Sequence, residues 1–335
     1  MLTVSAMSSG QEEYYLEIAR EDYFFDGGEP LGLWHGQGAK AFGRFGTVEK
    51  EQLRQFFEGY APDGTRPIVQ LKNWKDRKRQ AGWDLTFSVP KSVSVLWSVA
   101  GADLRKQIQE AHLEAVRAAL AYLEDVASFT RRGKGGHIVE KAKLVIATFE
   151  HGTSRALDPQ LHTHCLVVNA CVREDGTTGA ILSKPLYQAK MAAGALYRAE
   201  LSNQLEARLR LLLEREKTWF EVVGVPKPLM EESSKRRQQI KDALARYGAW
   251  SAKAAAIAAL DTREVKGHVA RSDLFAAWQK TGRAHGFTRE QVLRLPVRQE
   301  PRMDTMTERA KAAVASALKR ITEQHAHFAK NLSQN

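Results

Sequence analysis

The chain has 335 residues, enough for two ordinary domains or for one large domain with an appendage, so length excludes no class of enzyme. Lysine and arginine outnumber aspartate and glutamate by 50 to 39, and the net charge of +11 favours an acidic partner such as nucleic acid. No stretch approaches the roughly 20 apolar residues of a membrane-spanning helix, and the first residues lack the apolar segment of a signal peptide. We therefore expect a cytoplasmic protein without membrane insertion, and the two cysteines, Cys165 and Cys171, fit a reducing compartment.

Three of the eight tyrosines, Tyr14, Tyr15 and Tyr23, lie within ten residues near the amino terminus. Tyr14 and Tyr23 are nine residues apart, about two and a half helical turns, so one straight helix would not place them on the same side. A break or loop between them is expected. Packing of these rings onto a core is the simpler interpretation. The alternative is catalysis, in which a phenol of pKa about 10 attacks phosphorus beside a proton acceptor, a metal or both.

A dense basic run and an acidic residue follow in the next part of the chain. Lys72, Lys75 and Arg77 surround Trp74, and an aromatic ring among cations is typical of a surface that binds single-stranded nucleic acid, although a solvated face has the same pattern. Asp84 begins the apolar segment DLTFSV. An acidic residue at such a place either caps a turn or faces a site, so Asp84 is the candidate acceptor for a phenol proton.

Short apolar segments rich in β-branched residues alternate with long amphipathic ones. The segments expected to be strands are Asp84 to Val89, Val93 to Val99, Leu144 to Phe149, His164 to Val172 and Trp219 to Val223. The segments expected to be long helices are Asp103 to Val126 and Leu186 to Leu213. Strands separated by long helices favour a sheet covered by helices, in the α/β or α+β class, and they leave the strand order open.

The last third of the chain is rich in Ala, Lys, Arg, Glu and Gln. Four helices are expected there, at Glu231 to Tyr247, Ser251 to Leu260, Arg271 to Gly282 and Met303 to Phe328. Prolines after Val225 interrupt regular structure, so we divide the chain into a catalytic core, residues 1–225, and a helical part, residues 226–335. The basic loop Arg131 to His137 lacks the spacing of a phosphate-binding loop, and the sequence contains no GxxxxGK[ST], so no nucleotide motor is predicted.

Three histidines have the spacing of a metal site. His162 and His164 begin an apolar run, and residues two apart in a strand face the same way, which leaves Cys165 on the other face as a packing residue. His151 ends the preceding apolar run, so pairing of the two strands would bring a third imidazole beside the others. Three ligands with open positions are typical of a catalytic metal. The alternative is a histidine pair without metal, and imidazoles alone favour Zn, Ni, Cu or Fe over Mg.

Two longer blocks resemble a known family. GWDLTFSVPKSVSVLW at residues 82–97 is similar to the GxDLTFSAPKSVS block of conjugative relaxases of the MobF class, the TraI and TrwC type of HUH endonuclease. FEHGTSRALDPQLHTHCLVVN at residues 149–169 is similar to their FxHxTSRxxDPQLHTHxVxxN block. The adjacent pair Tyr14 and Tyr15, and WHGQGAKAFG at residues 34–43, complete the order. The resemblance runs from about residue 14 to 201, and it implies an antiparallel-rich central sheet covered by helices.

The same resemblance implies a role for each site residue. The three histidines would bind a divalent metal, Mg or Mn in the cell with Zn or Ni as alternatives, to polarise the scissile phosphate. Tyr14 would attack that phosphate to leave a 5′ phosphotyrosine, although Tyr15 could substitute for it. Asp84 would accept the phenol proton or orient a histidine. Tyr23 would make the second transesterification, and it precedes Phe24 where the family often has another tyrosine.

The implied substrate is single-stranded DNA at a conjugative origin of transfer, with a hairpin beside the nick. Arg155, in the loop between the histidines, and Lys91, after the proline turn, would contact DNA, although Lys91 could equally hold that turn. Residues 226–335 would close over the strand like fingers. The family implies a monomer, with accessory relaxosome proteins and a conjugative coupling protein as partners, and a helicase domain commonly follows.

Two other functions stay open. A rolling-circle replication initiator uses the same histidine pair and tyrosine chemistry, but it usually places the tyrosine after the histidine motif. A non-catalytic basic DNA-binding module with a structural metal is the alternative from another class, and it predicts that loss of Tyr14 leaves function intact.

Overall fold

The computed structural model describes residues 1–15, 30–70, 80–248, 250–262 and 269–297. The predictions for Tyr23, for the basic side chains of Lys72, Lys75 and Arg77, and for the helix Met303 to Phe328 concern residues outside these ranges.

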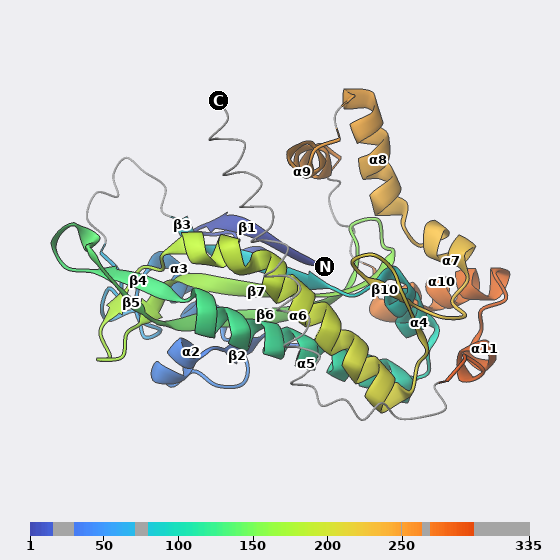
Figure 1. The fold of residues 1–335 in the computed structure, drawn as a ribbon, viewed down its shortest axis with the longest axis horizontal. Coiled ribbons are helices and arrows are strands. Elements are labelled where there is room, and N and C mark those ends of the chain that lie inside the picture. The colour runs from blue at the N-terminus through green and yellow to red at the C-terminus, as the bar shows by residue number, and fades with distance from the viewer. Residues whose placement is uncertain (16–29, 71–79, 249, 263–268, 298–335) are drawn as a thin grey trace, which may run out of the picture.

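A six-stranded antiparallel sheet forms the centre of the fold (Figure 1). Five strands follow in the order β1-β3-β7-β6-β2, β8 pairs with β7 outside this path, and each pair is antiparallel. The bounds are β1 Leu2–Ser8, β2 Leu33–His35, β3 Gln80–Ser88, β6 Lys143–Thr153, β7 Pro159–Val172 and β8 Thr178–Gly179. The predicted fold class, an antiparallel-rich sheet covered by helices, is confirmed.

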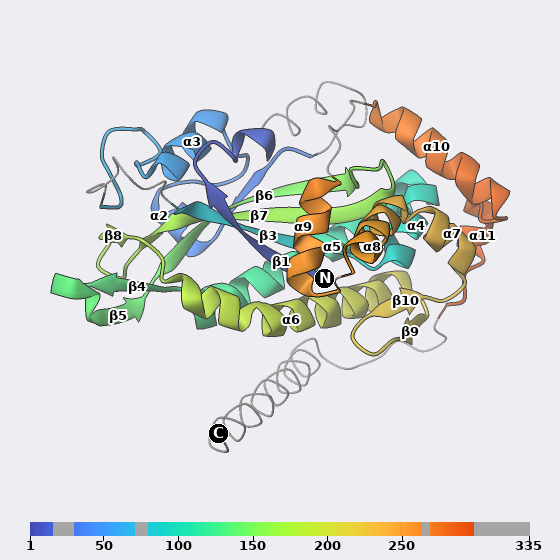
Figure 2. The ribbon, with the colours of Figure 1, turned by 90° about the horizontal axis from the view of Figure 1, so that it is seen from above.

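Helices cover both faces of this sheet (Figure 2). α5, Ala102–Ala127, and α6, Ser183–Leu209, pack against each other on one face, close to the predicted bounds of the two long helices. α2, Gln37–Ala41, and α3, Lys50–Glu58, contact the sheet from the other face. Because both faces are covered, the two longest strands are buried along most of their length and not only at every second residue.

Alternate residues of the strands enter two separate apolar cores. Cys165 and Val167 of β7 join the core under α5 and α6, whereas Leu166 and Val168 join the core that contains Phe57 of α3. This alternation fixes which side chains of β6 and β7 point toward α5.

The segment Val93 to Val99 was predicted as a strand, and this prediction is wrong, because it lies in helix α4, Lys91–Val99. Every residue from 92 to 99 is buried, since α4 packs between the sheet and the carboxyl-terminal helices. A helix that is buried on every side has no exposed polar face, so its sequence lacks the period that distinguishes a helix from a buried strand. Pro90 at the N-cap was the available signal for a helix start.

The carboxyl-terminal part of the described chain is helical, as predicted. Its helices are α7 Lys227–Glu232, α8 Lys235–Tyr247, α9 Ala252–Asp261, α10 Arg271–Ala284 and α11 Arg289–Leu293. Leu229, Trp278 and Val292 join the core under the central sheet. α8 and α9 form a small cluster of their own with Ala243 and Leu244, and they project from the body (Figure 1). The division of the chain after residue 225 stays a prediction.

Two short antiparallel ribbons lie outside the central sheet. β4, Phe129–Arg132, pairs with β5, Ile138–Lys141, so that the glycine-rich basic loop, with the one-turn helix η2 at Lys134–Gly136, forms the tip of a hairpin. β9, Leu213–Arg215, pairs with β10, Phe220–Val222, where a strand was predicted. No helix in the described ranges has the length and apolarity to cross a bilayer.

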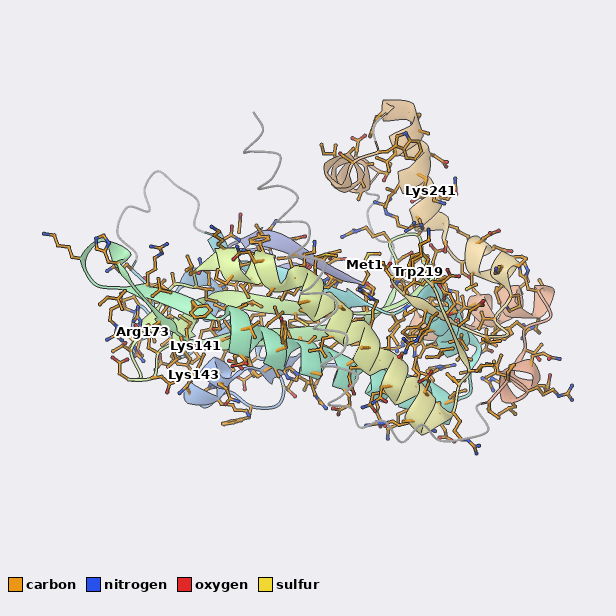
Figure 3. All side chains as sticks on the ribbon, viewed as in Figure 1. Met1, Lys141, Lys143, Arg173, Trp219 and Lys241 are labelled. Atoms are coloured by element: carbon orange, nitrogen blue, oxygen red, sulfur yellow. The ribbon has the colours of Figure 1, made fainter. Side chains whose placement is uncertain are left out.

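Figure 3 places three basic residues, Lys141, Lys143 and Arg173, beside the β4–β5 hairpin. Near the β4–β5 hairpin, Lys141 pairs with Asp125, Lys143 with Glu174 and Arg173 with Glu140, at 3.0 to 3.5 Å. Lys241 lies on the projecting helix α8 at the other end. Acidic partners therefore balance part of the charge at the hairpin end.

Candidate metal and tyrosine site

Strand pairing brings three histidines together at one end of the central sheet. His151 on β6 lies directly across from His162 on β7, and His164 follows on the same face because strand side chains alternate. The ring centroids are 4.9 to 5.5 Å apart, and one potential ligand nitrogen of each ring lies within 4.8 Å of the others. The structure thus shows the convergence that the spacing predicted.

Hydrogen bonds at Nδ1 orient two of these rings and make Nε2 their potential ligand atom. His162 Nδ1 donates to the carbonyl oxygen of Gln160 at 2.7 Å, and because a carbonyl only accepts, the lone pair stays on Nε2. His164 Nδ1 lies 2.8 Å from Oδ2 of Asp84, an arrangement that orients many metal-binding histidines. In the described part of the chain the cluster consists of three imidazoles, which fits a divalent ion with open coordination positions. This donor set fits several divalent metals.

Asp84 joins the histidines to a tyrosine. Its Oδ2 accepts the hydroxyl of Tyr15 at 2.9 Å in addition to its contact with His164. Thr86, two residues along β3, donates to the same carboxylate at 3.2 Å. The side chain of Asp84 is buried, and its carboxylate accepts three hydrogen bonds, which hold it in one orientation.

The two adjacent tyrosines have different contacts, because neighbouring residues of a helical turn point about 100° apart. The Tyr15 ring packs against His164, with centroids 4.8 Å apart, and against His151, with centroids 6.2 Å apart. The Tyr14 ring lies edge-on to that of Tyr15 at 5.2 Å, and its hydroxyl accepts a hydrogen bond from Arg155 Nη2 at 3.2 Å. In the structure the Tyr15 hydroxyl therefore contacts the Asp84 carboxylate, whereas the Tyr14 hydroxyl contacts Arg155.

Arg155 lies in a tight loop, residues 154–158, between β6 and β7, the two strands that carry the histidines. The loop contains Leu157 at a φ of 58°, a left-handed conformation that costs energy for a residue with a side chain. Trp278 of α10 stabilises this conformation, because its Nε1 donates to the carbonyl of Leu157 at 2.9 Å. Asp158, which is buried, accepts from the backbone N–H of Arg236 in the first turn of α8 at 3.0 Å.

These two contacts were not predicted. Asp158 stands in the quoted DPQLHTH block, so its place beside the histidines was visible, but its partner on α8 is 78 residues away. Trp278 carries no signal in the sequence, because its contact is 121 residues away along the chain.

Lys91 lies at the start of α4 and donates to two carbonyl oxygens, those of Pro159 at 3.0 Å and Ser233 at 2.8 Å. Burial lowers the pKa of Lys91 to about 8, and the nearby carboxylates of Asp158 and Glu221 oppose this shift. The contacts connect the beginning of β7 to the end of α7. They agree with the interpretation that Lys91 holds the turn, and its contact with DNA stays a prediction.

Cys165 lies between the metal-site histidine His164 and the core residue Leu166, and it points away from the histidines. It is fully buried under α5 and α6, as the strand alternation predicts. Burial raises the pKa of its thiol well above the ordinary value, and the negative charge of Asp84 acts in the same direction. A protonated, buried thiol is a packing residue and not a metal ligand.

Comparison with known proteins agrees with this geometry. Residues 8–285 match the family described as TrwC relaxase. The multifunctional conjugation protein TraI of Escherichia coli strain K12 is 36% identical over an alignment of 298 residues, and the match covers 84% of this chain and 16% of TraI. This chain therefore spans about a sixth of the length of that relative.

Solved structures of the conjugative relaxase TrwC are similar throughout their length. A metal-bound complex with oriT DNA is 33% identical, with a TM-score of 0.76, and the match covers 86% of this chain and 99% of that one. A complex with a 27-mer DNA that comprises the recognition hairpin and the cleavage site is 32% identical, with a TM-score of 0.73 and the same coverage. The metal-bound relative and the three histidines support a divalent metal cofactor here. The chain belongs to the TrwC relaxase family.

Proposed function

We propose that this chain nicks one DNA strand at a conjugative origin of transfer by transesterification, forms a 5′ phosphotyrosine adduct and later rejoins the strand. The observation that carries the proposal is Asp84, which contacts a phenol and a metal-site histidine through the same carboxylate oxygen. A phenol, a candidate proton acceptor and the histidine cluster thus meet at one point, beside the adjacent Tyr14, and a purely structural metal site does not require this arrangement. The oriT complexes of the relatives support this choice of substrate.

The reaction exchanges one bond at phosphorus for another. A tyrosine Oη forms a bond to phosphorus, the bond from phosphorus to the 3′ oxygen breaks, and the phenol proton passes by way of Asp84 to the departing 3′ oxygen. The number of phosphorus–oxygen bonds is unchanged, so no nucleotide is consumed and the step is reversible. A divalent metal on the three histidines, which we propose to be Mg or Mn in the cell, would polarise the phosphate. Arg155, beside the Tyr14 hydroxyl, would pair with a phosphate oxygen.

We assign Tyr14 as the first nucleophile and Tyr15 as a positioning residue. Tyr15 is held at its ring by two histidines and at its hydroxyl by Asp84, whereas the Tyr14 hydroxyl lies beside Arg155, the cation expected to bind the phosphate. Because the Tyr15 hydroxyl already donates to Asp84, the candidate proton acceptor, Tyr15 is the alternative nucleophile. Tyr23 is proposed for the second transesterification.

The helical part of the chain is proposed to close over the DNA. Tyr247, the last residue of α8, and Trp250, between α8 and α9, are exposed by 43% and 70%, and exposed rings beside a basic helix can stack on bases. Lys72, Lys75 and Arg77 are proposed to contact the DNA backbone. The proposed partners are the origin hairpin, accessory relaxosome proteins and a conjugative coupling protein, with the enzyme acting as a monomer in the cytoplasm.

A replication initiator would form the same adduct, so the adduct alone does not distinguish the two functions. The sequence order supports the relaxase, because Tyr14 and Tyr15 precede the histidine block. A replication initiator would cleave an origin of replication and not an origin of transfer. A non-catalytic DNA-binding module would form no adduct with either.

The proposed function is tested by the mass of the protein after it has met its DNA. Purified protein with Mn²⁺ is incubated with single-stranded oligonucleotides tiled across the DNA that flanks its gene. We expect one oligonucleotide to add the mass of its 3′ fragment to the protein and to release a fragment with a 3′ hydroxyl. If every oligonucleotide that the protein binds is cleaved to a free 5′ phosphate without an adduct, the enzyme is a hydrolase and the proposal is wrong.

Replacement of Arg155 should slow cleavage without removing the nucleophile. We expect Arg155→Ala to lower the single-turnover rate by about 10² and Arg155→Lys to recover part of it, because lysine keeps the charge but not the planar pair of donors. Arg117→Ala, which removes an exposed cation from α5, is the matched control and should cleave at the normal rate. An Arg155→Ala variant with normal kinetics would remove Arg155 from the mechanism.

A further inference from the structure

A chain of polar side chains crosses the apolar core directly behind the histidine strand. His112 of α5 is fully buried, and its Nε2 lies 2.8 Å from the hydroxyl of Thr163. Its Nδ1 lies 2.9 Å from the hydroxyl of Tyr197 on α6, which is also fully buried. Burial lowers the pKa of His112 to about 3, so the imidazole is neutral and offers one donor and one acceptor.

Thr163 is the residue between two of the metal-site histidines. Its side chain points toward α5, and those of His162 and His164 point to the opposite face. The backbone of Thr163 therefore sets the direction of both imidazoles. A rotation of this part of β7 about its own axis would move the two rings together.

The regular hydrogen-bond ladder of β7 ends close to the histidines. On one side the pairing with β3 ends at Ser88 opposite His162. On the other side the register with β6 shifts between His151 and Thr153, immediately beside His162. Residues 162–164 have strand partners on both edges, and the regular pairing stops immediately beyond His162. A side-chain contact from α5 to Thr163 therefore adds a restraint at the end of the regular ladder, where the strand presents its ligands.

A second polar residue of α5 forms a hydrogen bond with β6, the neighbouring strand. Gln109, one helical turn before His112, donates to Glu150, which precedes His151 and lies opposite Thr163 in the sheet. Apolar side chains of similar volume would fill this core at a lower desolvation cost than polar ones. Packing alone therefore does not explain why polar groups are buried here on both β6 and β7.

We propose that His112 is a positioning residue for the metal centre, which fixes the backbone of β7 through Thr163 so that His162 and His164 converge on one ion. The inference rests on the metal site of the proposed function. It adds a residue outside the three histidines on which binding of the metal depends. The effect is mechanical and concerns ligand direction, and it does not involve transfer of a proton from the substrate.

The test compares variants that keep the hydrogen bond between His112 and Thr163 with variants that lose it. An asparagine amide lies near the place of Nδ1 and a glutamine amide reaches near that of Nε2, so His112→Gln can keep the bond to Thr163 and His112→Asn cannot. Thr163→Ser keeps the hydroxyl, whereas Thr163→Val removes it and conserves the shape. Titration calorimetry with Mn²⁺ and the visible spectrum of the Co²⁺-loaded protein report on the site without DNA.

We expect His112→Asn and Thr163→Val to weaken Mn²⁺ binding by about 10-fold to 100-fold and to change the Co²⁺ spectrum. His112→Gln and Thr163→Ser should stay within about threefold of the wild type. Leu123→Ala, a cavity in the same helix away from these contacts, should lower the midpoint of thermal unfolding without changing the Mn²⁺ dissociation constant.

Normal Mn²⁺ affinity and a normal Co²⁺ spectrum in Thr163→Val would overturn the proposal, and the threonine pair decides the question if His112→Asn does not fold. Equal weakening in Thr163→Ser and Thr163→Val would also overturn it, because the hydroxyl would then have no role. Failure of the metal site itself is a separate result, in which the wild type and His162→Ala bind Mn²⁺ equally poorly.

Discussion

Tyr14→Phe is expected to abolish the covalent adduct and to lower the rate of cleavage of a linear oligonucleotide by about 10⁴ or more, because loss of a nucleophile removes the bond-forming atom. Tyr15→Phe should still form the adduct, at a rate reduced by about tenfold, since it loses one hydrogen bond to Asp84. Adduct formation on a denaturing gel measures both. Tyr60→Phe, which changes a tyrosine at the bridge to Pro67, is the matched control and should behave as wild type.

The opposite pattern would exchange the two roles. If Tyr15→Phe abolishes the adduct and Tyr14→Phe only slows it, the contact between Tyr15 and Asp84 marks the nucleophile. An adduct that persists in a variant lacking Tyr14, Tyr15 and Tyr23 would show that none of these tyrosines attacks the phosphate. Peptide mapping of the adduct would then identify the residue that does.

His162→Ala should abolish metal-dependent cleavage, with a rate loss of about 10³ or more and no measurable Mn²⁺ binding, because two imidazoles cannot hold the ion against water. Chelation of the metal from the wild type should give the same loss, and added Mn²⁺ should restore the wild type but not the variant. Binding of uncleaved oligonucleotide, measured by fluorescence anisotropy, should change less than the rate.

His137→Ala is a matched control, because His137 follows the tip of the β4–β5 hairpin and belongs to no metal cluster of the described residues. It should keep both metal binding and cleavage. Cleavage by His162→Ala that remains sensitive to chelation would place the functional metal elsewhere and would separate the three histidines from catalysis.

The histidine cluster could be predicted from sequence because it depends on local rules. Residues two apart in a strand face the same way, and a short loop brings the next strand alongside, so His162, His164 and His151 required only correct strand assignments. Asp84 could be predicted as a candidate site residue because it is an acidic residue at the head of an apolar strand. The resemblance to conjugative relaxases then connected these residues with the tyrosines.

Other features depend on contacts between distant segments. α4 was mistaken for a strand because a helix buried on all sides has no polar face. The choice of Tyr15 over Tyr14 as the partner of Asp84 depends on the direction in which a short helical turn enters the site. His112 and Thr163 are 51 residues apart, and neither residue type signals a buried hydrogen bond.

The tight loop between β6 and β7 has a consequence for how small this protein can be made. It is held by the backbone N–H of Arg236 on Asp158 and by the indole of Trp278 on Leu157. A chain shortened to its sheet would lose both contacts and would leave the unfavourable backbone at Leu157 without support. The smallest portable unit for the proposed attachment of a protein to a DNA end therefore includes the helices through α10.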